Sequence, residues 1–236
     1  AAMNPRLLPA PALIVGLGVL LLAIGLYGER LNNERHALAV RADVQSRLAL
    51  LRDRLNRNLV SDLQLVRGLV GVINLQPELD QAAFEHAVRP LLASSMQLRN
   101  VVAAPGMVVR LVVPLAGNER ALGLDYRVAP GQRESAERAR VSREMVLAGP
   151  LQLVQGGVGV IARLPVFVRD PQQPDGQRFW GLISAVIDAE RLFRASGLYE
   201  AGPEIELAIR GRDASGPAGE VFFGHAAIFD RDPVLA

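Results

Sequence analysis

The sequence of 236 residues contains no cysteine and no lysine. Without cysteine the chain can form neither a disulfide nor a cysteine-ligated zinc site, and it has no thiol nucleophile. All 26 basic residues are arginines, which are scattered among 24 acidic residues and leave a formal net charge of +2. Because positive charge is not concentrated in any segment, the pattern typical of nucleic-acid binding is missing. We therefore expect no nucleic acid among the partners.

Histidine is scarce as well, and the residue patterns of known catalytic sites are missing. The three histidines, His36, His86 and His225, each stand alone, with no second metal ligand at a suitable spacing. The sequence has no phosphate-binding loop, no nucleophile elbow and no metalloprotease helix. The glycine-rich segment 156–159 is not followed by a helix, so it predicts a turn between strands. We expect no catalytic residue, no metal and no cofactor in this chain.

The N-terminal part carries a long run without charged residues. The uncharged residues 7–28 number 22, and a helix of that length spans roughly 30 Å, about one hydrocarbon core of a bilayer. A cleaved signal peptide is the alternative, with a cleavage site at Ala23-Ile24-Gly25, although its apolar part is usually shorter. We predict that residues 1–28 form a cytoplasmic tail and one transmembrane helix. The rest of the chain then lies in the periplasm, anchored to the inner membrane.

Residues 29–67 contain neither glycine nor proline, which predicts one long helix after the membrane segment. Its apolar residues recur at steps of three or four and form a single stripe, made of Val44, Leu48, Leu51, Leu55, Leu59, Leu63, Val66 and Val70. We assign residues 29–71 to this stalk helix. Leu31 and Leu38 are predicted to face a second copy of the chain, giving a homodimer, and the later leucines to pack on the chain's own domain.

Beyond the stalk, helices precede and interrupt a run of strands. Residues 79–96 predict a helix that Pro90 kinks or breaks. Residues 133–145 predict a charged helix, and residues 188–195 a short helix with Asp188 as its N-cap. Apolar segments bounded by turn residues predict strands at 107–115, 121–125, 158–168, 179–187, 205–210 and 220–223. This order predicts an α+β fold with an antiparallel sheet.

One charged residue stands out in the predicted strand 158–168. At period two, Arg163 shares its face of the strand with three apolar residues, Ile161, Pro165 and Phe167. An arginine on an apolar face must either be paired or reach a polar cavity. Two interpretations stay open: a buried salt bridge, for instance with Asp125, or a cationic group inside a ligand pocket. Ser184, in the following strand, is a second candidate polar group for such a pocket.

Several motifs occur in the order found in one known family: Ala104-Pro105-Gly106, Pro114-Leu115, Gly117-Asn118-Glu119, Leu122-Gly123-Leu124-Asp125, Ala148-Gly149-Pro150-Leu151, Arg163-Leu164-Pro165-Val166-Phe167 and Phe179-Trp180-Gly181. On these motifs, residues 30–199 resemble the CHASE domain, the extracellular sensor of bacterial diguanylate cyclases and histidine kinases and of plant cytokinin receptors. The resemblance implies two PAS-like antiparallel-sheet subdomains: residues 72–187, membrane-distal and ligand-binding, and residues 188–236, part of a membrane-proximal one. It also implies a second transmembrane helix and a cytoplasmic output domain after residue 236.

The resemblance also implies where the ligand lies. It places the pocket in the membrane-distal subdomain, at Leu147, Ala148 and Leu151 and on the strand that carries Arg163. The plant receptors use an aspartate to hold the adenine ring of cytokinin. The corresponding turn in this chain, Gly117-Asn118-Glu119-Arg120, has no aspartate, so a cytokinin is not the expected ligand.

The leading functional hypothesis is therefore a ligand-sensing domain of a transmembrane signalling receptor. An unknown small molecule binds the distal subdomain, and the stalk helices of a homodimer carry the response to the membrane. The alternative is a periplasmic protein–protein interaction module without a small-molecule ligand. A cavity lined by Arg163 and apolar strand residues favours the first hypothesis, whereas a filled core with Arg163 in a salt bridge favours the second.

Overall fold

The computed structural model describes residues 10–153, 156–213, 216, 218–231 and 233–235, and within these ranges it describes side chains at residue 18 and from residue 20 onward. By its contacts the chain divides into two units. The first comprises residues 1–49 and 234–236, and the second residues 50–233. One helix, α1 (Ala10–Leu75), contributes residues to both.

In the first unit the described residues belong mainly to α1, whose apolar side chains are exposed at Leu20, Leu21, Leu22, Ile24 and Leu26. Within the part of the chain whose side chains are described, no helix is both long and apolar enough to cross a membrane. The predicted membrane segment 7–28 begins outside this part, because nothing is described of the side chains before residue 18. The long helix predicted for residues 29–71 is confirmed, and it ends at Leu75, just before Gln76-Pro77.

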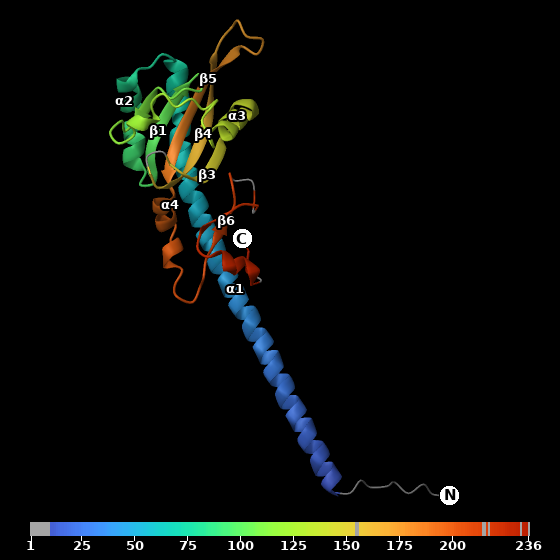
Figure 1. The fold of residues 1–236 in the computed structure, drawn as a ribbon. Helices are drawn as coiled ribbons and strands as arrows, with labels where there is room; N and C mark the ends of the chain where they lie inside the picture. Colours follow the sequence, from blue (N-terminus) through green and yellow to red (C-terminus); the bar gives the residue numbers. More distant parts are fainter. Residues whose placement is uncertain (1–9, 154–155, 214–215, 217, 232, 236) are drawn as a thin grey trace. The chain divides into compact units, whose positions relative to one another are not determined.

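The second unit is built on a five-stranded antiparallel sheet with the strand order β2-β1-β5-β4-β3 (Figure 1). The strands are β1 (Leu98–Pro105), β2 (Leu111–Val113), β3 (Val146–Gln152), β4 (Val158–Arg169) and β5 (Gln177–Asp188). The two longest strands, β4 and β5, form a hairpin next to the centre, so a residue in the middle of β4 is flanked by strands on both sides. The expected α+β fold with an antiparallel sheet is confirmed.

Helices α1 and α2 (Gln81–Ser94) cover one face of this sheet, and their apolar residues Val66, Ile73, Phe84 and Val88 join its core. The helix α2 begins at the N-cap Asp80, whose carboxylate accepts a hydrogen bond from the Ala83 amide. It continues through Pro90, where a break or kink was predicted.

The opposite face is covered by α3 (Arg133–Ser142) and by the connection from β2 to α3, which includes the short 3₁₀ helix η1 (Glu119–Ala121). A second apolar cluster fills this layer, formed by Val102, Ala104, Met107, Val109, Val112, Ala121, Tyr126, Ala136, Ala139, Val146 and Leu182. The sheet is therefore buried on both faces, which explains the nearly continuous apolar sequence of its central strands.

A β-bulge in β5 decides which face its residues reach. The β4–β5 register passes from Val166 opposite Gly181 to Phe167 opposite Phe179, which leaves Trp180 without a partner in β4. Trp180 consequently joins the face covered by α1 and α2, and its indole nitrogen donates to the Pro77 carbonyl at 2.9 Å. Gly181 next to it has φ +156, and a Cβ there would lie 2.2 Å from the Ala104 carbonyl oxygen. Only glycine fits this approach of β1 to β5.

One strand prediction is wrong, one is confirmed in a shorter form, and two strands were not predicted. Residues 121–125 form turns with a single bridge between Val108 and Asp125, where a strand was predicted. The predicted strand 107–115 is reduced to β2, because residues 105–109 turn back toward Leu124 and Asp125. The strands β1 and β3 were not predicted, and β3 begins at Val146 soon after α3 ends.

After β5 the chain forms α4 (Ala189–Ala195), with the predicted N-cap Asp188 accepting from the Arg191 amide at 3.0 Å. It continues through η2 (Leu198–Glu200) into a two-stranded sheet of β6 (Ile209–Arg210) and β7 (Val221–Phe223), and then η3 (Ala226–Asp230). The predicted strands 205–210 and 220–223 are confirmed in this shorter form. Phe193 of α4 stacks on Phe222 and packs edge-on against Phe223, which joins this segment to the core around α1.

Candidate functional site

Arg163 occupies the middle of β4 on the face covered by α3, and its side chain has no exposed surface. All three nitrogens of its guanidinium donate hydrogen bonds. Nε donates to the Ser135 hydroxyl at 2.9 Å, one terminal nitrogen to the Ser184 hydroxyl at 3.2 Å, and the other to the side-chain oxygen of Gln132. The ring of Tyr126 lies over the guanidinium at 4.4 Å. The cation is therefore held by residues from the sheet, from α3 and from the connection before α3.

None of these acceptors carries a charge. Among the described residues no carboxylate forms a salt bridge with Arg163, so of the two interpretations left open by the sequence the buried salt bridge, for instance with Asp125, is wrong. Asp125 instead accepts hydrogen bonds from Arg127, with the shortest at 2.6 Å, and these bonds hold the pKa of Asp125 below its usual value. Asp125 also accepts from the Arg127 amide, so it stabilises the turn before α3.

The structure brings most of the predicted site residues to one face of the sheet. Residues paired across an antiparallel ladder share a face, and Arg163 is opposite Ser184 in β5 and Val146 in β3. The neighbouring pairs are Pro165–Leu182 and Ile161–Ala148. Phe167, beyond the bulge, pairs with Phe179 and contacts its ring at 5.5 Å.

Leu147 and Leu151 are placed differently. Leu147 is opposite Ala162 and packs into the cluster of the α1 and α2 face, on the other side of the sheet from Arg163. Leu151 lies beyond the β-bulge in β3 and packs with Ile161, Leu153 and Val186 in a small cluster at the end of the sheet. Of the predicted residues, Leu147 is the one that the sheet separates from Arg163.

Three residues that contact Arg163 were not predicted: Tyr126, Gln132 and Ser135. They come from the connection and from α3, and their distance in sequence from β4 hides the contact. The structure shows why Gln132 is available, since it is the N-cap of α3 and yet makes no capping hydrogen bond. Its side-chain oxygen accepts from Arg163 instead.

A second buried polar group lies on the same face in β1. Asn100 has no exposed surface and pairs with Val186, the β5 residue two positions after Ser184. Its amide nitrogen donates to Asn118 at 2.7 Å. Its oxygen has no hydrogen-bond partner among the described residues, although it is buried. This layer of the domain therefore holds a buried amide whose bonding capacity the described residues leave partly unfilled.

A cavity of about 910 Å³ adjoins this layer and is open to solvent. It is lined by residues 127–131, by α3 and by two residues of the C-terminal segment, Arg212 and Asp213. Ser135, whose hydroxyl accepts from Arg163, forms part of the wall, whereas Arg163 itself does not. The guanidinium is thus separated from the cavity by the thickness of one side chain.

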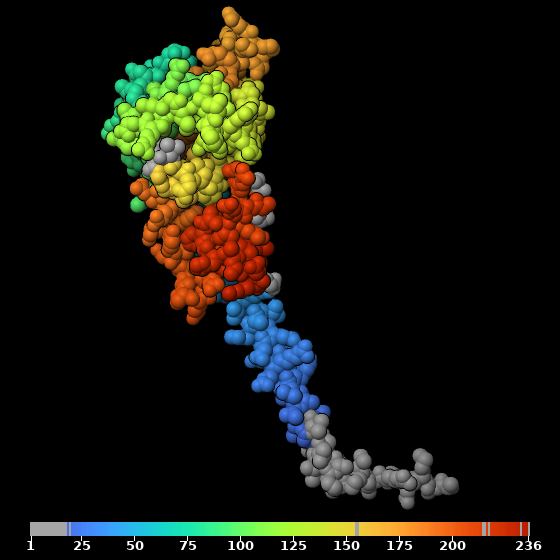
Figure 2. Space-filling model, in the orientation of Figure 1, coloured from blue at the N-terminus to red at the C-terminus, as the bar shows by residue number. Residues whose placement is uncertain are grey.

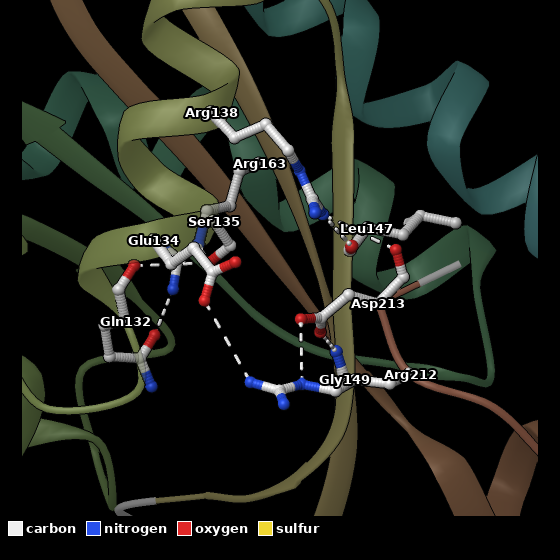
Figure 3. Close-up of polar contacts among 9 residues, drawn as sticks. All are labelled: Gln132, Glu134, Ser135, Arg138, Leu147, Gly149, Arg163, Arg212 and Asp213. Atoms are coloured by element: carbon white, nitrogen blue, oxygen red, sulfur yellow. Dashed lines mark hydrogen bonds and ion pairs between the residues drawn. The ribbon is translucent and has the colours of Figure 1, made fainter. Parts of the chain in front are cut away.

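The C-terminal segment is attached to this site through Asp213 (Figure 3). The Asp213 carboxylate accepts from the Gly149 amide at 2.6 Å, and the Asp213 amide donates to the Gly149 carbonyl at 3.1 Å. Arg138 of α3 donates to the carbonyls of Leu147 and Asp213, at 3.2 and 3.4 Å. In Figure 2 the C-terminal segment, in red, lies directly against β3, in yellow. We call these contacts the Asp213 clamp.

No group of histidine and acidic residues that could hold a metal ion exists among the described residues. The glycine-rich segment is a turn between β3 and β4, as predicted, closed by hydrogen bonds between Leu153 and the residues Gly156 and Gly157.

The fold and the motifs around Arg163 agree with one family model, that of the CHASE domain, which matches residues 56–223. The chain belongs to the CHASE domain family. CHASE domains are extracellular sensors and not catalytic domains, so the chain carries an extracytoplasmic sensor domain. The match begins within α1 and ends in β7.

A solved structure with a similar fold is an extracellular ligand-binding receptor from Desulfohalobium retbaense DSM5692. The two share 16% sequence identity with a TM-score of 0.56, over 77% of this chain and 33% of that one. The CHASE chain thus spans about a third of the receptor's length, and at this identity the likeness concerns the fold. A comparison with curated proteins found no match.

Proposed function

We propose that this chain is the periplasmic ligand-sensing part of a membrane-anchored signalling receptor. A small molecule binds the α3-covered face of the sheet at Arg163, a helix formed by residues 7–28 anchors the chain in the inner membrane, and the chain acts as a homodimer through α1. A diguanylate cyclase or histidine kinase domain elsewhere in the same receptor produces the output. The CHASE family and the fold of an extracellular ligand-binding receptor support this assignment.

One observation carries the proposal: among the residues that the structure describes, a fully buried arginine on the sheet face is held by neutral groups alone. A core built only for stability has no use for such a charge, because removing a charge from water is costly unless an opposite charge accompanies it. A cavity of about 910 Å³, within the range of small-molecule sites, adjoins this group. The arrangement is therefore suited to a ligand.

A protein–protein interaction module is the second candidate. The cavity is open and the nitrogens of Arg163 already have acceptors. Two apolar side chains on the cavity wall, Val128 and Val141, are 76% and 68% exposed. Apolar groups on an open surface favour a protein partner.

The test is thermal unfolding of the purified full chain with a broad library of small metabolites, measured by calorimetry. A ligand of the native state at a hundredfold excess over its Kd adds about 2.7 kcal/mol to the free energy of unfolding. We expect a compound with this effect on the wild type and on Arg110→Gln, an exposed arginine in the same domain. We expect no effect of the same compound on Arg163→Gln.

Two results contradict the proposal. If no metabolite in the library stabilises the protein, the interaction module becomes the better assignment. If a ligand is found but stabilises Arg163→Gln as strongly as the wild type, the binding site lies elsewhere on the chain.

A further inference from the structure

We infer that the ligand is a small organic anion, and that its carboxylate is the missing counter-charge of Arg163. This inference rests on the proposed function, and it names the chemical class that the site accepts. The sequence alone allowed a salt bridge within the protein, which the structure replaces with three neutral acceptors.

The charge of Arg163 cannot be removed by deprotonation, since a guanidinium stays protonated in proteins. A buried histidine or lysine without a partner can become neutral, but a buried arginine must be neutralised by an anion. The acidic residues close in sequence to the groups around Arg163 pair with other arginines. Glu134, beside Ser135, is exposed and lies 4.0 Å from Arg212, and Asp125 pairs with Arg127. Among the described residues, no carboxylate of the protein neutralises the charge of Arg163.

The guanidinium also has unused donors. It carries five N–H groups, and the contacts with Ser135, Ser184 and Gln132 use three of them. Among the described residues the other two N–H groups have no acceptor, and two is the number that a carboxylate accepts when it binds an arginine with both oxygens. A neutral amide or hydroxyl ligand would satisfy the hydrogen bonds but leave the charge uncompensated.

The start of α3 adds to the positive potential at this place. The first turn of a helix exposes amide groups and carries a partial positive charge. The side chain of its N-cap residue Gln132 makes no hydrogen bond to these amides and turns its oxygen to Arg163 instead. The helix has ten residues and its first turn lies against the buried arginine through Ser135. An anion at Arg163 is therefore attracted by two independent elements.

The adjoining cavity indicates an organic rather than an inorganic anion. Its wall includes Val128, Ala129, Pro130 and Val141, which can contact the carbon skeleton of a ligand. A volume of about 910 Å³ exceeds what a phosphate or sulfate ion needs. Ser135 stands between the cavity and the guanidinium, so its side chain has to move for the carboxylate to reach the two remaining N–H groups of Arg163, and binding changes the start of α3.

The test uses matched pairs of compounds of nearly the same shape, one charged and one neutral. The full chain is titrated with organic acids and with their primary amides, for example lactate and lactamide, succinate and succinamide, benzoate and benzamide, at constant ionic strength. Kd is measured by calorimetry for the wild type, Arg163→Gln, Arg163→Lys and the exposed control Arg110→Gln. We expect at least one acid to bind about tenfold or more tightly than its amide. This preference should survive in Arg110→Gln, weaken in Arg163→Lys and vanish in Arg163→Gln.

The outcomes separate the ligand class from the function. A neutral compound that binds and loses its affinity in Arg163→Gln keeps the sensor function and overturns the anionic ligand. An acid preference that persists in Arg163→Gln also overturns it, because the charge that selects the acid is then another one. If Arg163→Gln does not fold, acids and amides are compared in Arg163→Lys instead. This variant keeps the charge but cannot bind a carboxylate through both of its oxygens, so the preference for the acid should weaken. An unchanged preference overturns the anionic ligand at Arg163. If neither acids, amides nor the metabolite library bind, the proposed function fails together with the ligand class.

Discussion

Asp62 on α1 is a carboxylate that is almost entirely out of water, with 3% of its surface exposed. Burial raises its pKa above the usual value, and a hydrogen bond with Ser95 offsets this in part. One of its oxygens has no hydrogen-bond partner among the described residues. The ionised form is therefore less favourable in the folded chain than in the unfolded chain.

The sign of the resulting pH dependence follows from the raised pKa. Below the unfolded pKa, about 4, both states carry a neutral Asp62, and its contribution to stability is fully present. As pH rises through the higher pKa of the folded state, that contribution is lost. We expect Asp62→Asn to unfold with a free energy roughly 1 kcal/mol higher than the wild type at pH 7, and the difference to disappear near pH 4. Denaturant unfolding across this pH range measures both.

The control is Asp53→Asn, an exposed aspartate on the same helix that contacts Arg52. It should leave the pH profile close to that of the wild type. If the free energy of unfolding changes by the same amount between pH 4 and pH 7 in the wild type and in Asp62→Asn, the assigned role of this carboxylate is contradicted.

At the same scale, the sequence identified Arg163 and Ser184 but not the partners that come from α3 and the connection before it. Period two in β4 was enough to show that a charge stands among apolar residues on one face. Its partners depend on how α3 folds back over the sheet, which no local pattern encodes. Asp125 was a reasonable partner by charge, but Arg127 lies two residues away and reaches it first.

Local sequence patterns predict some helices and strands of this fold and not others. The helices α1 and α2 and the strands β4 and β5 have long periodic patterns or clear turn boundaries, and they form as predicted. The strand β1 is buried on both faces, so its apolar run has no alternation to reveal it. The strand β3 contains Gly149-Pro150, residues that normally interrupt strands, and it accommodates them at a bulge between Ala148 and Leu151.

The Asp213 clamp links two such elements, the bulge of β3 and the segment before β7. We expect Asp213→Ala to remove the hydrogen bond from the Gly149 amide and to lower the stability of this segment by about 1–2 kcal/mol. Hydrogen–deuterium exchange should then speed up at Gly149 and in residues 205–223, with the central strands unchanged. Since Arg138 connects the clamp to α3, ligand affinity should change as well.

Asp230→Ala is the matched control, an exposed aspartate in the same C-terminal segment. Exchange at Gly149 should not respond to it. Equal exchange in Asp213→Ala and the wild type would show that the segment is held by its aromatic contacts with Phe193 and not by the clamp.

For the whole molecule, the proposed homodimer depends on the membrane-proximal part of α1. Leu38 there is 68% exposed, and Leu31, seven residues earlier, lies on the same side of the helix. We expect the double variant Leu31→Asp/Leu38→Asp to shift the full chain in detergent from dimer to monomer, because two carboxylates in an apolar seam oppose association. Sedimentation equilibrium measures the change in mass.

Asn33→Asp introduces a single aspartate on another side of the helix, and we expect this variant to remain dimeric. A wild type that sediments as a monomer at all concentrations would exclude α1 as a dimer interface. A double variant that stays dimeric would place the interface outside this stripe.

The β-bulge that turns Trp180 to the α1 and α2 face has an optical consequence. Trp180 is the only tryptophan of the chain, it is 5% exposed, and it donates to Pro77 just after α1. The indole emission of the whole chain therefore originates from a single place, on the side of the sheet opposite to Arg163. A compound bound at Arg163 cannot quench this emission by contact. Any change in the emission wavelength or lifetime therefore has to come from a structural change that is transmitted across the sheet. The chain thus contains its own fluorophore on the side of the sheet where the stalk helix packs.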